Sequence, residues 1–160
     1  MPDRDNPFRR VGERETLVDV LDYRREGVVA KVVDLDVEAA TRPAVPSGTS
    51  LLGLVKHLTW VEELWFTEVL RGLEDPLPSP TLEEGDDVAS VVAAYRAAWA
   101  RSNEVIRAQD DLDVRCVGTG VAPEPMTLRW VLVHMVEETA RHAGHADIIR
   151  EAIDGAKSMG

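Results

Sequence analysis

The sequence predicts an all-α fold, and specifically a four-helix bundle with long loops. Four segments of roughly 20 to 28 residues place apolar side chains at the three- and four-residue spacing of an amphipathic helix. The segments between them are rich in proline, glycine and small polar residues, which favour turns. The alternating pattern of a half-buried strand is nearly absent, and we find no internal repeat. Helices without a sheet pack most simply as one bundle around one core.

The first half of the chain supplies two of the helices. Residues 1–12 are expected to form an irregular arm, and a helix is expected over 13–34, with Gly27 as a weak point. The stretch TRPAVPSGTS then predicts a loop. Ser50 is a good N-cap for the next helix, which should end at Gly72 because glycine readily adopts the left-handed conformation that closes a helix.

The second half supplies the other two helices. The Pro-rich stretch LEDPLPSPTLEEG predicts a second loop, and an alanine-rich helix should begin near Asp86. The connector that follows is too irregular for a helix, with a short extended piece expected at 114–117. The last helix should run from its N-cap Thr127 to about residue 154, and Gly155 should stop it. These connections are longer than ordinary bundle turns, so they either cross over along the bundle or cover one end of it.

Length and composition predict a single domain over residues 1–160, with 156–160 as a short tail. The formal net charge of -11 argues against binding to nucleic acid or to an anionic membrane, because both need a positive field. No apolar run reaches the ~20 residues that span a bilayer, and the N-terminus lacks the apolar core of a signal peptide. Cys116 is the only cysteine, so no internal disulfide can form. We therefore expect a cytoplasmic protein.

Histidine is concentrated in the last predicted helix. An α-helix turns about 100° per residue, which places His142 inside the apolar stripe and Glu138, one turn earlier, at its edge. His145 lies further out, and His134 further still, where a boundary residue without chemistry is expected. His134 and His142 are about 12 Å apart along the helix axis, so they cannot bind one ion. The inward direction therefore favours Glu138 and His142 as a ligand pair.

The second predicted helix carries two further polar residues on or beside its apolar face. His57 lies at one edge of the stripe, and Glu62 falls within it. An ionised carboxylate on a core face is unfavourable unless it is paired. Glu62 therefore needs a hydrogen-bonded partner, a raised pKa or a place near a metal ion, and the sequence leaves all three explanations open.

Together, His57, Glu138 and His142 offer two imidazoles and one carboxylate from two helices. Three protein ligands with open positions for water or substrate are typical of a catalytic metal site rather than a structural one. The set suits Zn²⁺, which we expect first, with Ni²⁺ or Fe²⁺ as alternatives. The same residues also fit a metal-free interpretation, in which the histidines are hydrogen-bonded boundary residues and Glu138 and His142 form a simple salt bridge.

Two stretches carry a resemblance to a known family. LLGLVKHLTWVEELWF, followed by LRWVLVHMVEETARHAGHADIIRE, resembles the DinB-like superfamily and in particular its uncharacterised bacterial branch. The resemblance implies a four-helix bundle in up-down-down-up order that is often dimeric, so a homodimer is expected. It also implies a divalent metal held by His57, Glu138 and His142. Many members have histidine at the position of Glu138, whereas the similar mycothiol-dependent maleylpyruvate isomerases have glutamate there.

Characterised relatives use low-molecular-weight thiols such as mycothiol or bacillithiol, which implies a thiol cosubstrate for this chain. The leading hypothesis is a metal-dependent thiol S-transferase or isomerase that acts on a small electrophile. In this hypothesis His145 or Glu62 is a catalytic residue that orients a ligand or moves a proton. The alternative is a non-catalytic stress-response module that holds a metal or an apolar ligand. A third hypothesis is a metal-free bundle in which Glu62 is protonated.

Overall fold

The computed structural model describes residues 12–118 and 126–157, so the predicted N-terminal arm lies almost wholly outside the described residues, as does most of the predicted tail. The all-α prediction is confirmed. No helix in the described part of the chain is both long enough and apolar enough to cross a membrane. The helical elements are α1 (Glu13–Val29), α2 (Val37–Thr41), α3 (Leu51–Glu63), the π-helical segment η2 (Leu64–Val69), α4 (Val88–Arg107) and α5 (Leu128–Asp154).

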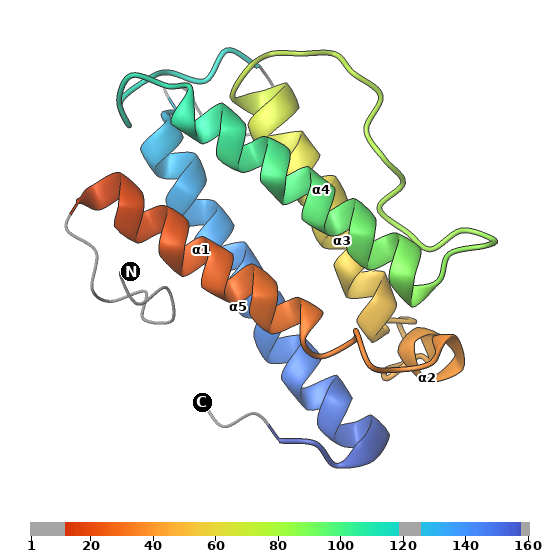
Figure 1. Cartoon of the computed structure of the whole chain (residues 1–160). Helices are drawn as coiled ribbons and strands as arrows, with labels where there is room; N and C mark the ends of the chain where they lie inside the picture. The colour runs from red at the N-terminus through yellow and green to blue at the C-terminus, as the bar shows by residue number, and fades with distance from the viewer. Residues whose placement is uncertain (1–11, 119–125, 158–160) are drawn as a thin grey trace.

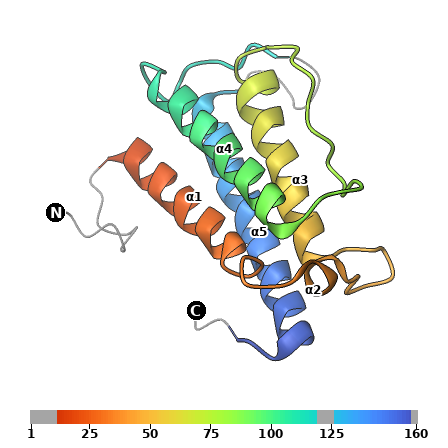
Figure 2. The same ribbon diagram turned by 45° about the vertical axis from the view of Figure 1, so that its right-hand side comes forward.

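The four long helices α1, α3, α4 and α5 form the bundle (Figure 1). α1 packs chiefly against α5, and α3 packs chiefly against α4 while also contacting α5. Figures 1 and 2 show that α3 and α4 run in one direction, whereas α1 and α5 run in the opposite direction. Two consecutive helices that run the same way need a connection about as long as a helix. Residues 70–87 provide it by crossing back along the outside of the bundle.

Polar side chains begin the helices close to where the sequence predicts. The side chains of Ser50 and Thr127 accept hydrogen bonds from backbone N–H groups three residues later, so both predicted caps are confirmed. α4 is capped by Asp87 and not by Asp86. The shift of one residue arises because Asp87 and Ser90 form a reciprocal capping box, in which each side chain accepts from the backbone N–H of the other residue.

The first predicted helix, over 13–34, is too long. α1 ends at Val29 and is followed by turns, although apolar residues continue at helical spacing beyond it. The short helix α2 follows within a segment for which the sequence predicts no helix. Asp36 begins α2 by accepting a hydrogen bond from the N–H of Ala39. The helix therefore ends before the apolar pattern does, and a separately capped short helix follows it.

Glycines end two of the helices as predicted. α3 continues through η2, whose wider π-helical turn is closed by a hydrogen bond from the N–H of Leu70 to the carbonyl of Trp65. The chain then turns at Gly72, where φ is 66°. α5 ends at Gly155, where φ is 77° and the conformation is left-handed. The extended piece predicted in the long connector consists of one isolated bridge, from residue 115 to residue 127.

The core consists of two apolar clusters stacked along the bundle. The first cluster includes Phe66 and Leu132 and is built around η2 and the first half of α5. The second cluster includes Leu58 and Ile149 and is built around α3 and the second half of α5. Four of the buried polar residues, one taken from each long helix, lie near the level where the two clusters meet, and we call these four the polar layer: Arg25, Glu62, Ser102 and Thr139.

Replacing Gly27 with alanine should stabilise the protein. Gly27 lies within α1, and a Cβ atom added there meets no atom within 4 Å. Alanine is the better helix former, so the free energy of unfolding should rise by about 0.5–1 kcal/mol. Urea unfolding followed by circular dichroism measures this change.

Gly118 provides the contrasting substitution. A Cβ atom at Gly118 would lie 2.2 Å from the carbonyl oxygen of Glu68, so the backbone must shift to accommodate alanine. Gly118→Ala should therefore lower the free energy of unfolding by about 1–3 kcal/mol. If Gly27→Ala and Gly118→Ala changed the free energy of unfolding equally, the difference in the surroundings of the two glycines would be contradicted.

Candidate metal centre

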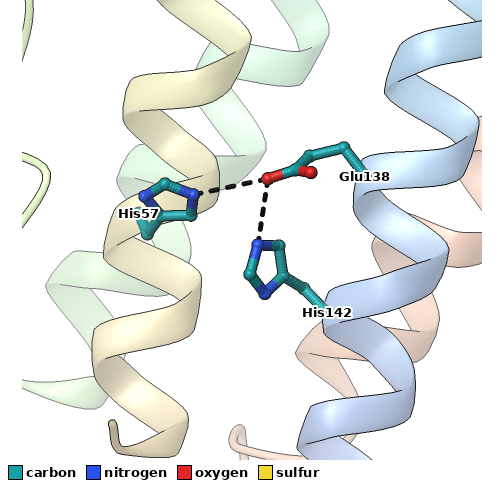
Figure 3. Close-up of side chains that lie close together, drawn as sticks. All are labelled: His57, Glu138 and His142. Carbon is teal, nitrogen blue, oxygen red and sulfur yellow. Dashed lines mark hydrogen bonds and ion pairs between the residues drawn. The ribbon is translucent and has the colours of Figure 1, made fainter. Parts of the chain in front are cut away.

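Three side chains converge in the seam between α3 and α5 (Figure 3). His57 comes from α3, whereas Glu138 and His142 lie one turn apart on α5. The Nε2 atom of His142 lies 3.0 Å from Glu138 Oε1, and the Nε2 atom of His57 lies 3.5 Å from the same oxygen. Within residues 12–118 and 126–157, this is the one group of three or more histidine, cysteine or acidic side chains whose ligand atoms all lie within 4.8 Å of one another.

The donor set fits a divalent cation. A tetrahedral zinc ion with bonds of about 2.0–2.1 Å separates its ligand atoms by about 3.3 Å. The two measured separations, 3.0 Å and 3.5 Å, lie on either side of that value. Exposure of the His57, Glu138 and His142 side chains is 33%, 12% and 15%, respectively. The group is therefore partly shielded from water, yet a small exchangeable ligand can reach it.

Two of the three side chains have the protonation states that a metal ion requires. Burial raises the pKa of Glu138, but the charge and hydrogen bond of His142, together with Arg141, lower it by more, so the pKa lies below its ordinary value. Burial lowers the pKa of His142 by more than Glu138 raises it, so this pKa also lies below its ordinary value. At neutral pH Glu138 is therefore ionised and His142 is largely neutral, as metal ligands must be.

Two further residues on α5 orient these side chains. Arg141 Nη1 lies 2.9 Å from Glu138 Oε2, which leaves Oε1 directed toward the two histidines. His145 Nδ1 lies 3.4 Å from His142 Nδ1, the ring nitrogen that does not face Glu138. Contacts of this kind fix the tautomer and ring orientation of a metal-binding histidine. Sequence reasoning missed the contact between Arg141 and Glu138, although their three-residue spacing on a helix is a signal for it.

Glu62 does not belong to this group of side chains. It is 1% exposed, and its two carboxylate oxygens accept hydrogen bonds from Arg25 Nε and Nη2 at 2.7 Å and 2.6 Å. The hydroxyl of Ser102 donates to it as well, at 2.7 Å. A hydrogen-bonded partner is thus the explanation that the structure provides for a carboxylate on the core face of α3.

His134 lies among aromatic side chains. Its ring stacks on Trp130 at an interplanar angle of 9° and a centroid distance of 5.1 Å. The centroid of Trp65 is 4.4 Å away on another side. His134 is half-buried at the boundary of the first apolar cluster, as the helical wheel predicts. It serves as a matched control for the histidines of the candidate metal centre.

A cleft of about 400 Å³ opens beside the three side chains, and His57 and His142 form part of its wall. Two loops supply much of the remainder: residues 47–50 before α3, and residues 80–82 of the crossover connection. The loop residues in the wall carry no charged side chain and include several hydroxyl groups. The cleft is therefore suited to a small polar molecule that reaches the candidate metal centre from the side of these loops.

The helical bundle and its histidine–carboxylate centre define a protein of the DinB-like class. Within that class, the chain belongs to the mycothiol S-transferase family, because the family model described as Mycothiol-S-transferase matches residues 16–155. A crystal structure of a conserved protein from Enterococcus faecalis is similar in fold, with a TM-score of 0.69 and 16% sequence identity. That similarity covers 92% of this chain and 100% of the other. A search of the curated proteins found no significant match.

Replacing His142 with alanine should abolish stoichiometric metal binding, because it removes one of three protein ligands. Elemental analysis of untagged protein purified without chelator should find near-stoichiometric zinc, nickel or iron in the wild type and almost none in the variant. A chelator should lower the melting temperature of the wild type but not that of His142→Ala, since a metal bound only to the native state stabilises it.

His134→Ala is the control for this measurement and should retain the metal, because His134 lies outside the group. Wild-type protein that binds none of the three ions, even after incubation with each, would contradict the metal centre. That result would favour the metal-free pairing of Glu138 with His142.

Proposed function

We propose that this protein is a divalent-metal-dependent S-transferase that joins a low-molecular-weight thiol of the mycothiol type to a small electrophile. The observation that carries the proposal is the convergence of His57, Glu138 and His142 beside a cleft, in a chain of the mycothiol S-transferase family. We propose zinc as the metal, with nickel or iron as alternatives, since the ligand set suits all three.

The residues of the centre have distinct roles in this proposal. A divalent cation held by His57, Glu138 and His142 supplies a Lewis acid that lowers the pKa of a bound thiol. Arg141 keeps one oxygen of Glu138 directed toward the histidines. With Nε2 of His142 on the cation, its Nδ1–H would donate a hydrogen bond to His145 Nδ1, so His145 orients this ligand, and the thiol proton passes to water. The thiol sulfur forms a bond to the electrophilic carbon, and the leaving group departs with the bonding electron pair.

The cleft determines which molecules reach the centre. Its loop residues offer hydroxyl and backbone groups but no side-chain charge. Such a lining hydrogen-bonds polar, uncharged parts of a substrate and contributes little to binding ionic ones. The loops at 47–50 and 80–82 are therefore the segments in which we expect substrate preference to reside.

The activity is tested by thiol conjugation. Zinc-loaded protein is mixed with mycothiol and a chromogenic aryl chloride, and product formation is followed by absorbance and mass spectrometry. His57→Ala and His142→Ala should both reduce the rate by at least about 100-fold, because each removes a metal ligand. His134→Ala should react at the wild-type rate. Equal rates in all four proteins would refute the proposal.

His145→Ala should separate the orientation of His142 from metal binding itself. The variant keeps all three ligands, so its metal content should match that of the wild type. Its conjugation rate should fall on the order of tenfold, which is typical when a residue that orients a metal ligand is lost. Unchanged rates across pH 6–8 would show that His145 has no part in the reaction.

A thiol-dependent isomerase is the second candidate. The observation that favours it is Glu138, because the maleylpyruvate isomerases that resemble this chain have glutamate at that position. An isomerase returns its thiol unchanged at the end of each turnover, whereas a transferase consumes it. Measuring free thiol during turnover of cis-configured unsaturated acids therefore distinguishes the two activities.

A further inference from the structure

The proposed chemistry makes no use of the most deeply buried charges in the protein. Arg25 and Glu62 are 0% and 1% exposed, and both oxygens of Glu62 accept hydrogen bonds from the same guanidinium. The remaining nitrogen of Arg25, Nη1, donates to Asp22 at 2.7 Å and to Asn103 at 2.9 Å. Arg25 therefore connects α1 to both α3 and α4 in the middle of the bundle.

Stability alone does not explain this polar layer. A buried ion pair is often no more stabilising than apolar side chains of similar volume. The hydroxyl of Thr139, a member of the layer, and that of Tyr95 are also buried without a hydrogen-bond partner in the described structure. Unpaired buried hydroxyls are unfavourable. A continuous apolar core would avoid these costs, so the layer calls for another role.

The layer lies where the two helix pairs of the bundle meet. α1 packs chiefly on α5, and α3 packs chiefly on α4. The candidate metal centre is divided in the same way, because His57 belongs to α3 whereas Glu138 and His142 belong to α5. Apolar contacts between the pairs are not directional and do not by themselves select one axial position. A bidentate ion pair selects one position along the helix axis, because its atoms must meet at hydrogen-bond distance.

We propose that Arg25 and Glu62 are positioning residues for the metal centre: their buried ion pair sets the register of α3 against α1 and α5, and so places His57 opposite Glu138 and His142. This inference rests on the metal centre of the proposed function. Neither residue contacts the reacting groups, and both act through the helices that carry them.

The dimensions of a helix support this role. His57 precedes Glu62 by five residues, or about 7.5 Å along α3, so the ion pair and the ligand move together as one rigid segment. The ligand atoms of the three residues lie within 4.8 Å of one another. A slip of α3 by one turn, about 5.4 Å, would remove His57 from the group altogether. A smaller displacement would alter the coordination geometry.

The double substitution Arg25→Met with Glu62→Leu tests the inference. It removes both charges while keeping apolar volume, so the melting temperature should stay near or above that of the wild type. Cobalt(II) serves as the probe, since its visible absorption reports coordination geometry. The affinity for cobalt should fall on the order of tenfold, and the absorption band should shift. A purely structural ion pair would leave both readouts unchanged.

The control removes a neighbouring ion pair, which joins α3 to α4. Glu63 and Arg101 pair at the surface, where the Arg101 side chain is 57% exposed. Glu63→Gln with Arg101→Gln should bind cobalt as the wild type does, because an exposed pair does not set helix register.

The outcomes separate the two proposals. If the double variant folds and has the cobalt affinity and spectrum of the wild type, the positioning role is overturned and the metal centre stands. If the double variant does not fold, Glu62→Asp replaces it, since this change keeps the charge and shortens the side chain by one methylene. Wild-type cobalt binding in Glu62→Asp would equally overturn the role. Wild-type protein that binds no cobalt refutes the metal centre and the inference with it.

Discussion

An ion pair that water scarcely reaches holds the centre of this bundle together. Arg25 and Glu62 are almost wholly buried, and their mutual contacts, together with those to Ser102, Asp22 and Asn103, replace water. Separating such a pair leaves a buried charge without compensation, which commonly costs about 3–5 kcal/mol. The apolar clusters above and below tolerate small adjustments, whereas this pair does not. The arrangement of α1, α3 and α4 is therefore constrained most strongly at this level.

The candidate metal centre depends on two kinds of proximity. Glu138 and His142 are neighbours in any α-helix that contains them, because residues four apart lie on the same face. Their contact with His57 requires α3 and α5 to pack side by side in opposite directions, as the crossover of residues 70–87 permits. The pair Glu138 and His142 is thus set by local helix geometry, whereas the position of His57 beside them depends on the whole fold.

The environment of the centre suits exchange with small molecules. The three candidate ligands are neither fully buried nor freely exposed, and the loops that form the cleft lie on the surface of the bundle rather than within its core. Arg141 and His145 restrain the ligands from the outer side of α5. A helical seam therefore carries the candidate coordinating atoms, while loops form much of the wall of the cleft. This division is common among binding sites.

Sequence alone determined the long helices, most of their ends and the inward direction of Glu138 and His142. Each of these properties depends on residues within a few positions, such as the caps at Ser50 and Thr127 or the glycine at Gly155. Tertiary structure decided what local patterns do not contain. The partner of Glu62 lies 37 residues away in the chain, on another helix. The third candidate ligand and the walls of the cleft likewise come from distant segments, which only packing brings together.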